Sequence, residues 1–223
     1  MARYSRASDP EALSLAAEAL RAGSVVALPT DTVYGLAVDP SIPHSVERLF
    51  ALKERPSEVA LPLLVGTRAQ AGTIVRPLDG VARGLAGRYW PGPLTLVLLR
   101  RRGLDVDLGG PPSARKTVGV RLPDHALVVN LCTELGPLAV TSANLHGAPP
   151  ATTVEEVVGT FDEGGRMGGQ GIAVILDGGR CDGSPSTVVE CLGGSVRCLR
   201  QGAIPWSEIR EQFTGVGLPP ADP

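Results

Sequence analysis

Four short segments of this 223-residue chain carry polar side chains that could bind a ligand. Each follows or ends an apolar run, and the ligands of α/β proteins bind in the crevice outside the ends of the strands. Hydroxyl, amide, carboxylate and cationic groups are combined in them, which favours an anion or a nucleotide as ligand. The segments are residues 29–36 (PTDTVYGL), 53–56 (KERP), 118–123 (VGVRLP) and 138–144 (LAVTSAN).

Cations and hydrogen-bond donors dominate the four segments. Lys53, Arg55 and Arg121 supply positive charge, and no paired nucleophile and base accompanies them. Such a set suits phosphate, carboxylate or carbonate ligands and transfer chemistry by positioning and charge stabilisation. Each segment alone also has a structural explanation: a turn after a strand, a lysine at a helix C-terminus, or a buried ion pair of Arg121. The residues by themselves therefore predict an anion or nucleotide site and leave its substrate open.

Sequence signatures of several other enzyme classes are absent. Residues 110–117 (GPPSARKT) imitate a P-loop, but Arg115 stands at the second glycine position, and the prolines at 111 and 112 lack N–H groups. No G-x-G-x-x-G, G-x-S-x-G or H-E-x-x-H motif is present, which argues against dehydrogenases, α/β-hydrolases and zinc proteases. The three histidines and four cysteines show no zinc-ligand spacing, so we expect reduced structural cysteines and no protein-bound metal.

The charge balance constrains where phosphates can bind. Lys and Arg total 21 and Asp and Glu total 23, so the net charge of −2 provides no general attraction to nucleic acid or anionic lipid. Any phosphate-binding surface must therefore be a local arrangement of charge. Of the basic residues only Lys53 and Lys116 are lysines, a bias that a GC-rich genome produces. A lysine retained under that bias merits inspection, because its ammonium is a compact point charge.

Short strands and helices must position the polar segments. The first helix is expected to be capped by Asp9 and ended by Gly23, and the last to open with a capping box of Thr153 and Glu156. Helices alternate with strands until the last three strands, which predicts one α/β domain with a mixed sheet. The predicted strands are residues 25–28, 61–65, 94–99, 118–122, 138–140, 172–176, 187–189 and 196–199, and the predicted helices are residues 11–22, 43–52, 78–88, 124–135 and 153–161.

The chain is expected to form a single domain over residues 1–214, followed by a flexible tail rich in proline and glycine at 215–223. No apolar run approaches the roughly 20 residues that a membrane-spanning helix needs. The N-terminus shows no signal-peptide pattern. We therefore expect a cytoplasmic protein without membrane association.

In this order, the four segments and several neighbouring motifs resemble the YrdC-like family of threonylcarbamoyl-AMP synthases. The resemblance runs from about residue 22 to residue 204. It implies the single-domain branch, with a twisted mixed parallel/antiparallel sheet flanked by helices and a basic concave cleft. The further motifs are residues 90–96 (WPGPLTL), 124–125 (DH), 177–179 (DGG), 186–189 (STVV) and 199–202 (LRQG).

The resemblance also implies an activity. Family members are nucleotidyltransferases that convert L-threonine, bicarbonate and ATP into L-threonylcarbamoyladenylate and pyrophosphate. The product is the activated intermediate for threonylcarbamoyladenosine at position 37 of certain tRNAs. Downstream tRNA threonylcarbamoyl transferase machinery is therefore the implied partner, and direct binding of tRNA or double-stranded RNA is consistent with it. Mg²⁺ is expected to arrive on the ATP phosphates.

By motif position, the resemblance assigns roles to single residues. Arg121 is the implied partner of the threonine carboxylate, and Thr32 and Ser186 are further threonine contacts. Lys53 and Arg55 would face the ATP phosphates, where a point-charge lysine and a forked arginine are complementary. The implied ATP contacts are Lys53, Arg55, Thr117, Ser142 and Arg200, and the implied catalytic residues are Lys53, Arg55, Ser142 and Asn144.

The chain departs from the family pattern at three positions. Leu61 stands where a lysine or asparagine is usual, His146 replaces a serine, and Pro150 replaces a small polar residue. Leu61 and Pro150 favour an alternative, a non-catalytic RNA-binding or ribosome-associated paralogue that uses the same cleft. A third hypothesis is a related carbamoyl-transfer module that acts on another amine.

Overall fold

A ten-stranded mixed sheet organises the chain, and the computed structural model describes residues 2–54, 59–104, 106–162, 165–168 and 171–212. The strand order is β1-β8-β2-β3-β7-β4-β6-β5-β9-β10. Parallel pairs such as β5 with β9 adjoin antiparallel pairs such as β5 with β6, which confirms the predicted mixed sheet. The strands are β1 (Arg3–Arg6), β2 (Val25–Leu28), β3 (Gly35–Val38), β4 (Leu63–Leu64), β5 (Leu94–Leu99), β6 (Thr117–Arg121), β7 (Leu138–Ser142), β8 (Ile172–Asp177), β9 (Thr187–Leu192) and β10 (Ser195–Arg200).

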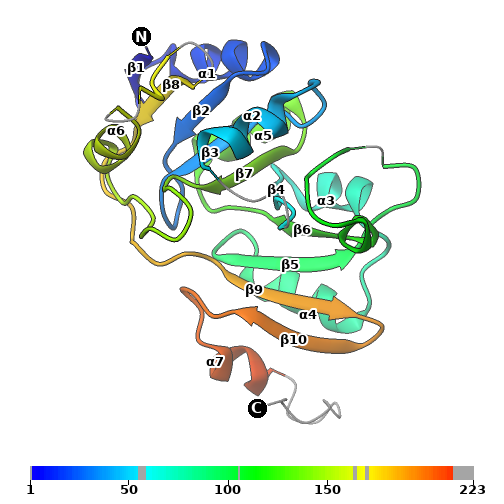
Figure 1. Cartoon of the computed structure of the whole chain (residues 1–223). Coiled ribbons are helices and arrows are strands. Elements are labelled where there is room, and N and C mark those ends of the chain that lie inside the picture. Colours follow the sequence, from blue (N-terminus) through cyan, green and yellow to red (C-terminus); the bar gives the residue numbers. More distant parts are fainter. Residues whose placement is uncertain (1, 55–58, 105, 163–164, 169–170, 213–223) are drawn as a thin grey trace.

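Helices flank the sheet, as Figure 1 shows, with α1 beside the strands at one end and α7 beyond β10 at the other. Alanine and leucine side chains of α1 pack with α5 against β2 and β8, which covers one face of that end. The helices are α1 (Ala12–Arg21), α2 (Ser45–Leu52), α3 (Arg68–Ile74), α4 (Gly80–Tyr89), α5 (Ala126–Leu135), α6 (Val154–Asp162) and α7 (Trp206–Glu211), with a 3₁₀ turn η1 (Pro112–Lys116). Among the residues described, no helix is long and apolar enough to cross a bilayer.

Successive side chains of β5 point to opposite faces of the sheet, one facing the core and the other facing a cavity. Leu94, Leu96 and Leu98 are buried in the large core cluster together with residues of α3 and α4. Thr95 and Val97, which point the other way, line a cavity. Because successive strand residues point to opposite faces, α3 and α4 cover one face and the cavity opens on the other.

Every predicted strand and helix overlaps an observed one, but the predicted start of the first helix is wrong. This helix begins at Ala12, and the Asp9 carboxylate instead accepts hydrogen bonds from the Arg6 N–H (2.9 Å) and the Ser5 hydroxyl (3.2 Å). Gly23 follows the helix with φ of +70°, as its position predicted. The strand predicted over residues 61–65 is reduced to Leu63–Leu64. The predicted C-terminal tail lies outside the described residues.

Candidate functional site

The cavity beside β5 collects residues from segments that are far apart in the sequence. It encloses about 600 Å³ and is lined by β5, β6, β7, β9, β10 and the loop before β3. Lys53 lies next to this lining, since its ammonium contacts two of the lining residues. Arg55 falls outside the described residues. The predicted site residues that line the cavity are Thr32, Thr117, Arg121, Ser142, Asn144, Ser186 and Arg200.

Arg121 ends β6 and is held by three hydrogen bonds, with only 7% of its side chain exposed. Its Nε donates to the Gly92 carbonyl (3.0 Å) and one terminal nitrogen to Thr32 Oγ1 (3.0 Å). The other terminal nitrogen forms an ion pair with Asp31 Oδ1 at 2.5 Å. Guanidinium has five N–H donors, so one donor remains on each terminal nitrogen. A carboxylate in the cavity can accept from these remaining donors.

A second cluster lies where β7 ends. Lys53, the residue after α2, is 3% exposed, and its ammonium donates to the Ser142 carbonyl and to Asn144 Oδ1 (3.3 Å). The Ser142 hydroxyl also donates to Asn144 Oδ1 (2.5 Å). The Asn144 amide is oriented by donating to the carbonyls of Leu145 (2.8 Å) and Ala148 (2.6 Å). The helix end and the strand end thus form one polar cluster, although they are about ninety residues apart.

The third cluster joins β5, β9 and β10. The Ser186 and Thr95 hydroxyls are 2.9 Å apart, and Arg200 donates to both the carbonyl (2.8 Å) and the hydroxyl (3.2 Å) of Ser186. Partial burial of the Arg200 guanidinium and the nearby charge of Arg121 lower the pKa of Arg200. Two arginines therefore approach the same region of the cavity, where each raises the affinity for an anion.

The three departures from the family pattern have different surroundings. Leu61 is 1% exposed and belongs to the hydrophobic core, so its side chain is not available to a ligand. Pro150 lines the cavity, and His146 is exposed. Of these replacements, Pro150 is the one whose side chain faces the cavity.

The expected basic character of the cleft is not confirmed. Among the described lining residues, the charged side chains are Arg121 and Arg200, and the charge of Arg121 is balanced by Asp31 at 2.5 Å. Valine, proline, leucine and alanine side chains make up much of the remaining lining. The cavity is therefore a largely apolar pocket with cations at particular positions, a composition typical of small-molecule sites.

Three contributors to the site were not among the predicted site residues. Thr95 contacts Ser186, and Asp31 contacts Arg121. Thr95 lies in the motif at residues 90–96 and Asp31 in the segment at residues 29–36, so membership of these motifs is the sequence signal that could have identified them. Tyr34 is fully buried and anchors the loop before β3, because its hydroxyl donates to the Gly179 carbonyl (2.8 Å) and accepts from the Gly178 N–H (3.1 Å). Burial raises the pKa of Tyr34 to about 12, which keeps the phenol neutral.

Gly202 brings the exit of β10 against the backbone that carries Ser186. A Cβ at this position would lie 2.1 Å from the Pro185 carbonyl oxygen and 2.6 Å from the Ser186 carbonyl carbon. We expect Gly202→Ala to lower the free energy of unfolding by about 1–3 kcal/mol, because backbone must move to relieve the overlap. Urea denaturation measures this. Gly159→Ala in α6, where a Cβ meets nothing within 4 Å, is the matched control, and equal stability of both variants would contradict the prediction.

His125 precedes α5 and lies close to the Arg121 cluster. Its Nδ1 and the Asp31 Oδ2 atom are buried and form no hydrogen bond with a described residue. Burial lowers the pKa of His125, partly offset by the charges of Asp31 and Asp124. The imidazole of His125 therefore binds a proton more readily in the unfolded chain than in the folded protein. Folding stability is expected to fall as the pH drops below about 6.5.

The melting temperature of the wild type, measured from about pH 8 to about pH 5, tests this expectation. His125→Asn removes the titrating group and should show a smaller decrease over the same range. His44→Asn, at an exposed position on the N-terminal side of α2, is the control. An unchanged pH profile in His125→Asn would contradict the assignment.

Comparison with known proteins shows that the motifs and the fold are found in the same family. The domain family Sua5_yciO_yrdC, described as "Telomere recombination", matches residues 18–202. A relative from Mycobacterium tuberculosis is 35% identical over 209 residues, which cover 92% of each chain. The threonylcarbamoyl-AMP synthase of Bacillus subtilis is 36% identical over 204 residues, which cover 91% of this chain and 56% of that protein.

A solved structure shows the same architecture. The crystal structure of P. abyssi Sua5 complexed with L-threonine superposes with a TM-score of 0.81 at 33% identity, covering 96% of this chain and 61% of that one. This chain thus spans less than two thirds of the length of the Bacillus subtilis and P. abyssi proteins. The matched residues, the mixed sheet and the shared motifs lead to one conclusion: the chain belongs to the Sua5/YciO/YrdC family.

Proposed function

We propose that this protein is an L-threonylcarbamoyladenylate synthase, a nucleotidyltransferase that uses L-threonine, bicarbonate and ATP. One observation carries the proposal: a single cavity of about 600 Å³ brings the Arg121 cluster and the Lys53 cluster to one space. Relatives named threonylcarbamoyl-AMP synthase support it, as does the L-threonine complex of the P. abyssi protein. Mg²⁺ belongs to the ATP substrate in this proposal.

The Arg121 cluster suits the amino acid. The remaining N–H donors of Arg121 bind the threonine carboxylate, and the hydroxyls of Thr32 and Ser186 are available to its polar groups. Asp31 holds the guanidinium in place, so the arginine is oriented before the substrate arrives. Threonine would thereby be fixed by its carboxylate, with its amino group free to form the carbamate.

The Lys53 cluster suits the phosphate end. Lys53, Ser142 and Asn144 contribute an ammonium, a hydroxyl and an amide, with Thr117 and Arg200 elsewhere in the lining. Arg55 is assigned to the phosphates by its motif position only. These groups would stabilise charge on the phosphates as a carbamate oxygen attacks the α-phosphorus. The bond from the α-phosphorus to the bridging oxygen then breaks, and pyrophosphate leaves with the electron pair.

The biological setting follows from the product. A mixed carbamic–phosphoric anhydride is reactive, so a transferase that places the threonylcarbamoyl group on tRNA must consume it. We therefore propose downstream tRNA threonylcarbamoyl transferase machinery as the partner and the cytoplasm as the location. The catalytic unit proposed is residues 1–214.

Pyrophosphate release by the purified protein tests the proposal. We expect release only when L-threonine, bicarbonate and Mg·ATP are all present, with threonylcarbamoyladenylate identified by mass spectrometry. Release that is equal or faster with another amine than with L-threonine would instead support a related carbamoyl-transfer module. RNA binding without any adenylate product would support the non-catalytic alternative.

A further inference from the structure

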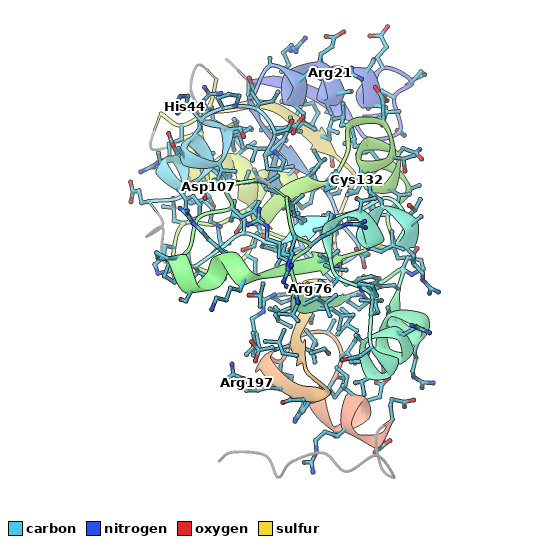
Figure 2. All side chains as sticks on the ribbon, turned by 90° about the vertical axis from the view of Figure 1, so that its right-hand side faces the viewer. Arg21, His44, Arg76, Asp107, Cys132 and Arg197 are labelled. Carbon is cyan, nitrogen blue, oxygen red and sulfur yellow. The ribbon has the colours of Figure 1, made fainter. Side chains whose placement is uncertain are left out.

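Gly119 stands in the middle of β6, the strand that crosses the centre of the molecule in both views (Figure 1 and Figure 2). It separates Val118 and Val120, whose side chains are buried in the core. A glycine in a strand interior is unfavourable, because it loses more conformational freedom on folding than other residues and packs no side chain. A specific requirement therefore keeps this position without a side chain.

The backbone does not impose this requirement. The φ of Gly119 is not in the positive region that favours glycine, and β6 pairs with β5 without a register shift. A Cβ built at Gly119 would lie 3.6 Å from the nearest described backbone atom outside its own segment, the Cα of Pro62, which is an ordinary contact distance. At Gly202, in contrast, a Cβ would lie 2.1 Å from a backbone oxygen. Close approach of another backbone therefore does not explain Gly119.

The neighbouring side chains also leave room for a methyl group. The same Cβ would lie 3.2 Å from the Cβ of Pro62 and 3.4 Å from the Cγ2 of Thr95. These contacts are tight, but small shifts of the two side chains relieve them, so the protein itself can accommodate alanine here. A glycine that neither the backbone nor the packing demands marks a place where a ligand approaches the strand closely.

The position without a side chain faces the cavity. Residues 117, 119 and 121 share one face of β6, because side chains alternate along a strand, and all three line the cavity. Val97, directly opposite Gly119 on β5, lines it too. Each strand residue advances about 3.4 Å, so the Cα atoms of Thr117 and Arg121 are about 13 Å apart. Gly119 lies halfway between them and forms a flat part of the cavity floor.

The proposed function places the two ends of the reacting substrates on opposite sides of Gly119. Arg121 binds the threonine carboxylate, and Thr95 and Ser186, whose hydroxyls are 2.9 Å apart, lie at the same end. Thr117 is assigned to ATP by its motif position. In the adduct, the carbamate group joins the amino nitrogen of threonine to the α-phosphorus. The carbamate therefore lies between the two ends.

We propose that the carbamate and the α-phosphate that it attacks lie directly over Gly119, and that the missing side chain provides the space in which they react. This inference rests on the proposed function and assigns Gly119 a direct contact with the reacting atoms. The apolar side chains of Pro62 and Val97 line the same part of the cavity. They exclude water from the mixed anhydride, which water would hydrolyse.

Pyrophosphate release by Gly119→Ala, together with separate calorimetric titrations of L-threonine and of a non-hydrolysable ATP analogue, tests the proposal. The added methyl group lies under the reacting atoms and away from the carboxylate and the terminal phosphates. We expect kcat to fall about 10–100-fold, because one extra carbon or a displacement of about 1 Å has effects of this size. Each ligand alone should bind within about threefold of the wild type, and Gly119→Val should lower kcat further.

Gly84→Ala is the matched control, since Gly84 lies on α4, on the other face of the sheet, where a Cβ meets nothing within 4 Å. Its kcat should equal that of the wild type. The melting temperature shows whether each variant is folded. A Gly119→Ala protein that does not fold would overturn the proposal, because the structure leaves room for the methyl group.

Two kinetic results would also overturn the proposal: wild-type kcat in Gly119→Ala, or a loss of threonine binding as large as the loss of kcat. The second result would indicate a purely structural role of Gly119. Either result, obtained while the wild type synthesises the adenylate, refutes this inference alone. A wild-type protein that forms no adenylate refutes the proposed function and this inference with it.

Discussion

Replacement of Lys53 by methionine is expected to lower the rate of pyrophosphate release by about 10²–10³-fold. The ammonium of Lys53 is nearly buried and contacts the Ser142 carbonyl and Asn144 Oδ1 at the end of β7. A cation held in a site that excludes water interacts strongly with charge that develops on the phosphates. Methionine keeps the apolar stem and removes only the charge. The measurement is kcat and KM for ATP with saturating threonine and bicarbonate.

The chain provides its own control, because its other lysine is Lys116. Lys116 is exposed in the turn before β6, and Lys116→Met is expected to retain wild-type kinetics. Threonine binding by calorimetry and the melting temperature show whether the Lys53→Met protein is folded. If folded Lys53→Met protein works within about threefold of the wild type, Lys53 does not stabilise the reacting phosphates.

Replacement of Arg121 by lysine is expected to raise the KM for L-threonine by about 10²-fold or more, with a smaller effect on the KM for ATP. Lysine keeps the positive charge beside Asp31 but cannot reproduce the fork that reaches Gly92, Thr32 and a carboxylate together. Each lost hydrogen bond to a charged group costs about 1.5–3 kcal/mol, and about 2.7 kcal/mol corresponds to about 10²-fold. Steady-state kinetics with each substrate varied in turn measures the effect.

Two companion variants separate binding from folding. Arg121→Ala leaves Asp31 as an uncompensated buried charge and is expected to lower stability strongly, so we combine it with Asp31→Asn. The double variant should fold and still fail to bind threonine. Arg197→Lys, at an exposed ion pair with Glu190, is the conservative control. Equal threonine affinity in Arg121→Lys and the wild type would contradict the assignment.

The sequence predicted much of the fold because local patterns decide much of it. The apolar run of β2 is buried along its whole length and those of β5 and β8 are mostly buried, which single-sequence patterns reveal. The edge strand β1 and the short strand β3 were missed. β1 is polar and mostly exposed, and β3 begins inside the polar segment that precedes it, so neither shows a clear period.

The candidate site could likewise be predicted only in part from the sequence. The family motifs selected nine site residues, and the structure places eight of them in or beside one cavity, whereas Arg55 lies outside the described residues. The eight are Thr32, Lys53, Thr117, Arg121, Ser142, Asn144, Ser186 and Arg200. Thr95 contacts Ser186, and Asp31 contacts Arg121, because strand pairing brings together segments that are about ninety residues apart in the sequence. Hydrogen-bond partners of this kind have no local signature. The expectation of a basic cleft was not confirmed, because the charged side chains among the described lining residues are Arg121 and Arg200, and Asp31 balances the charge of Arg121.

By itself, the sequence determined the α/β class, the mixed sheet and the residue types able to bind an anion. Periodicity and strand-end chemistry are local properties, so they can be read along the chain. The tertiary structure alone decided which cations share the cavity and which carboxylate balances Arg121. The physical reason is that charges interact through space: strand pairing brings Asp31 within 2.5 Å of Arg121, ninety residues away in sequence, and side-chain alternation on β5 sends neighbouring residues to opposite faces.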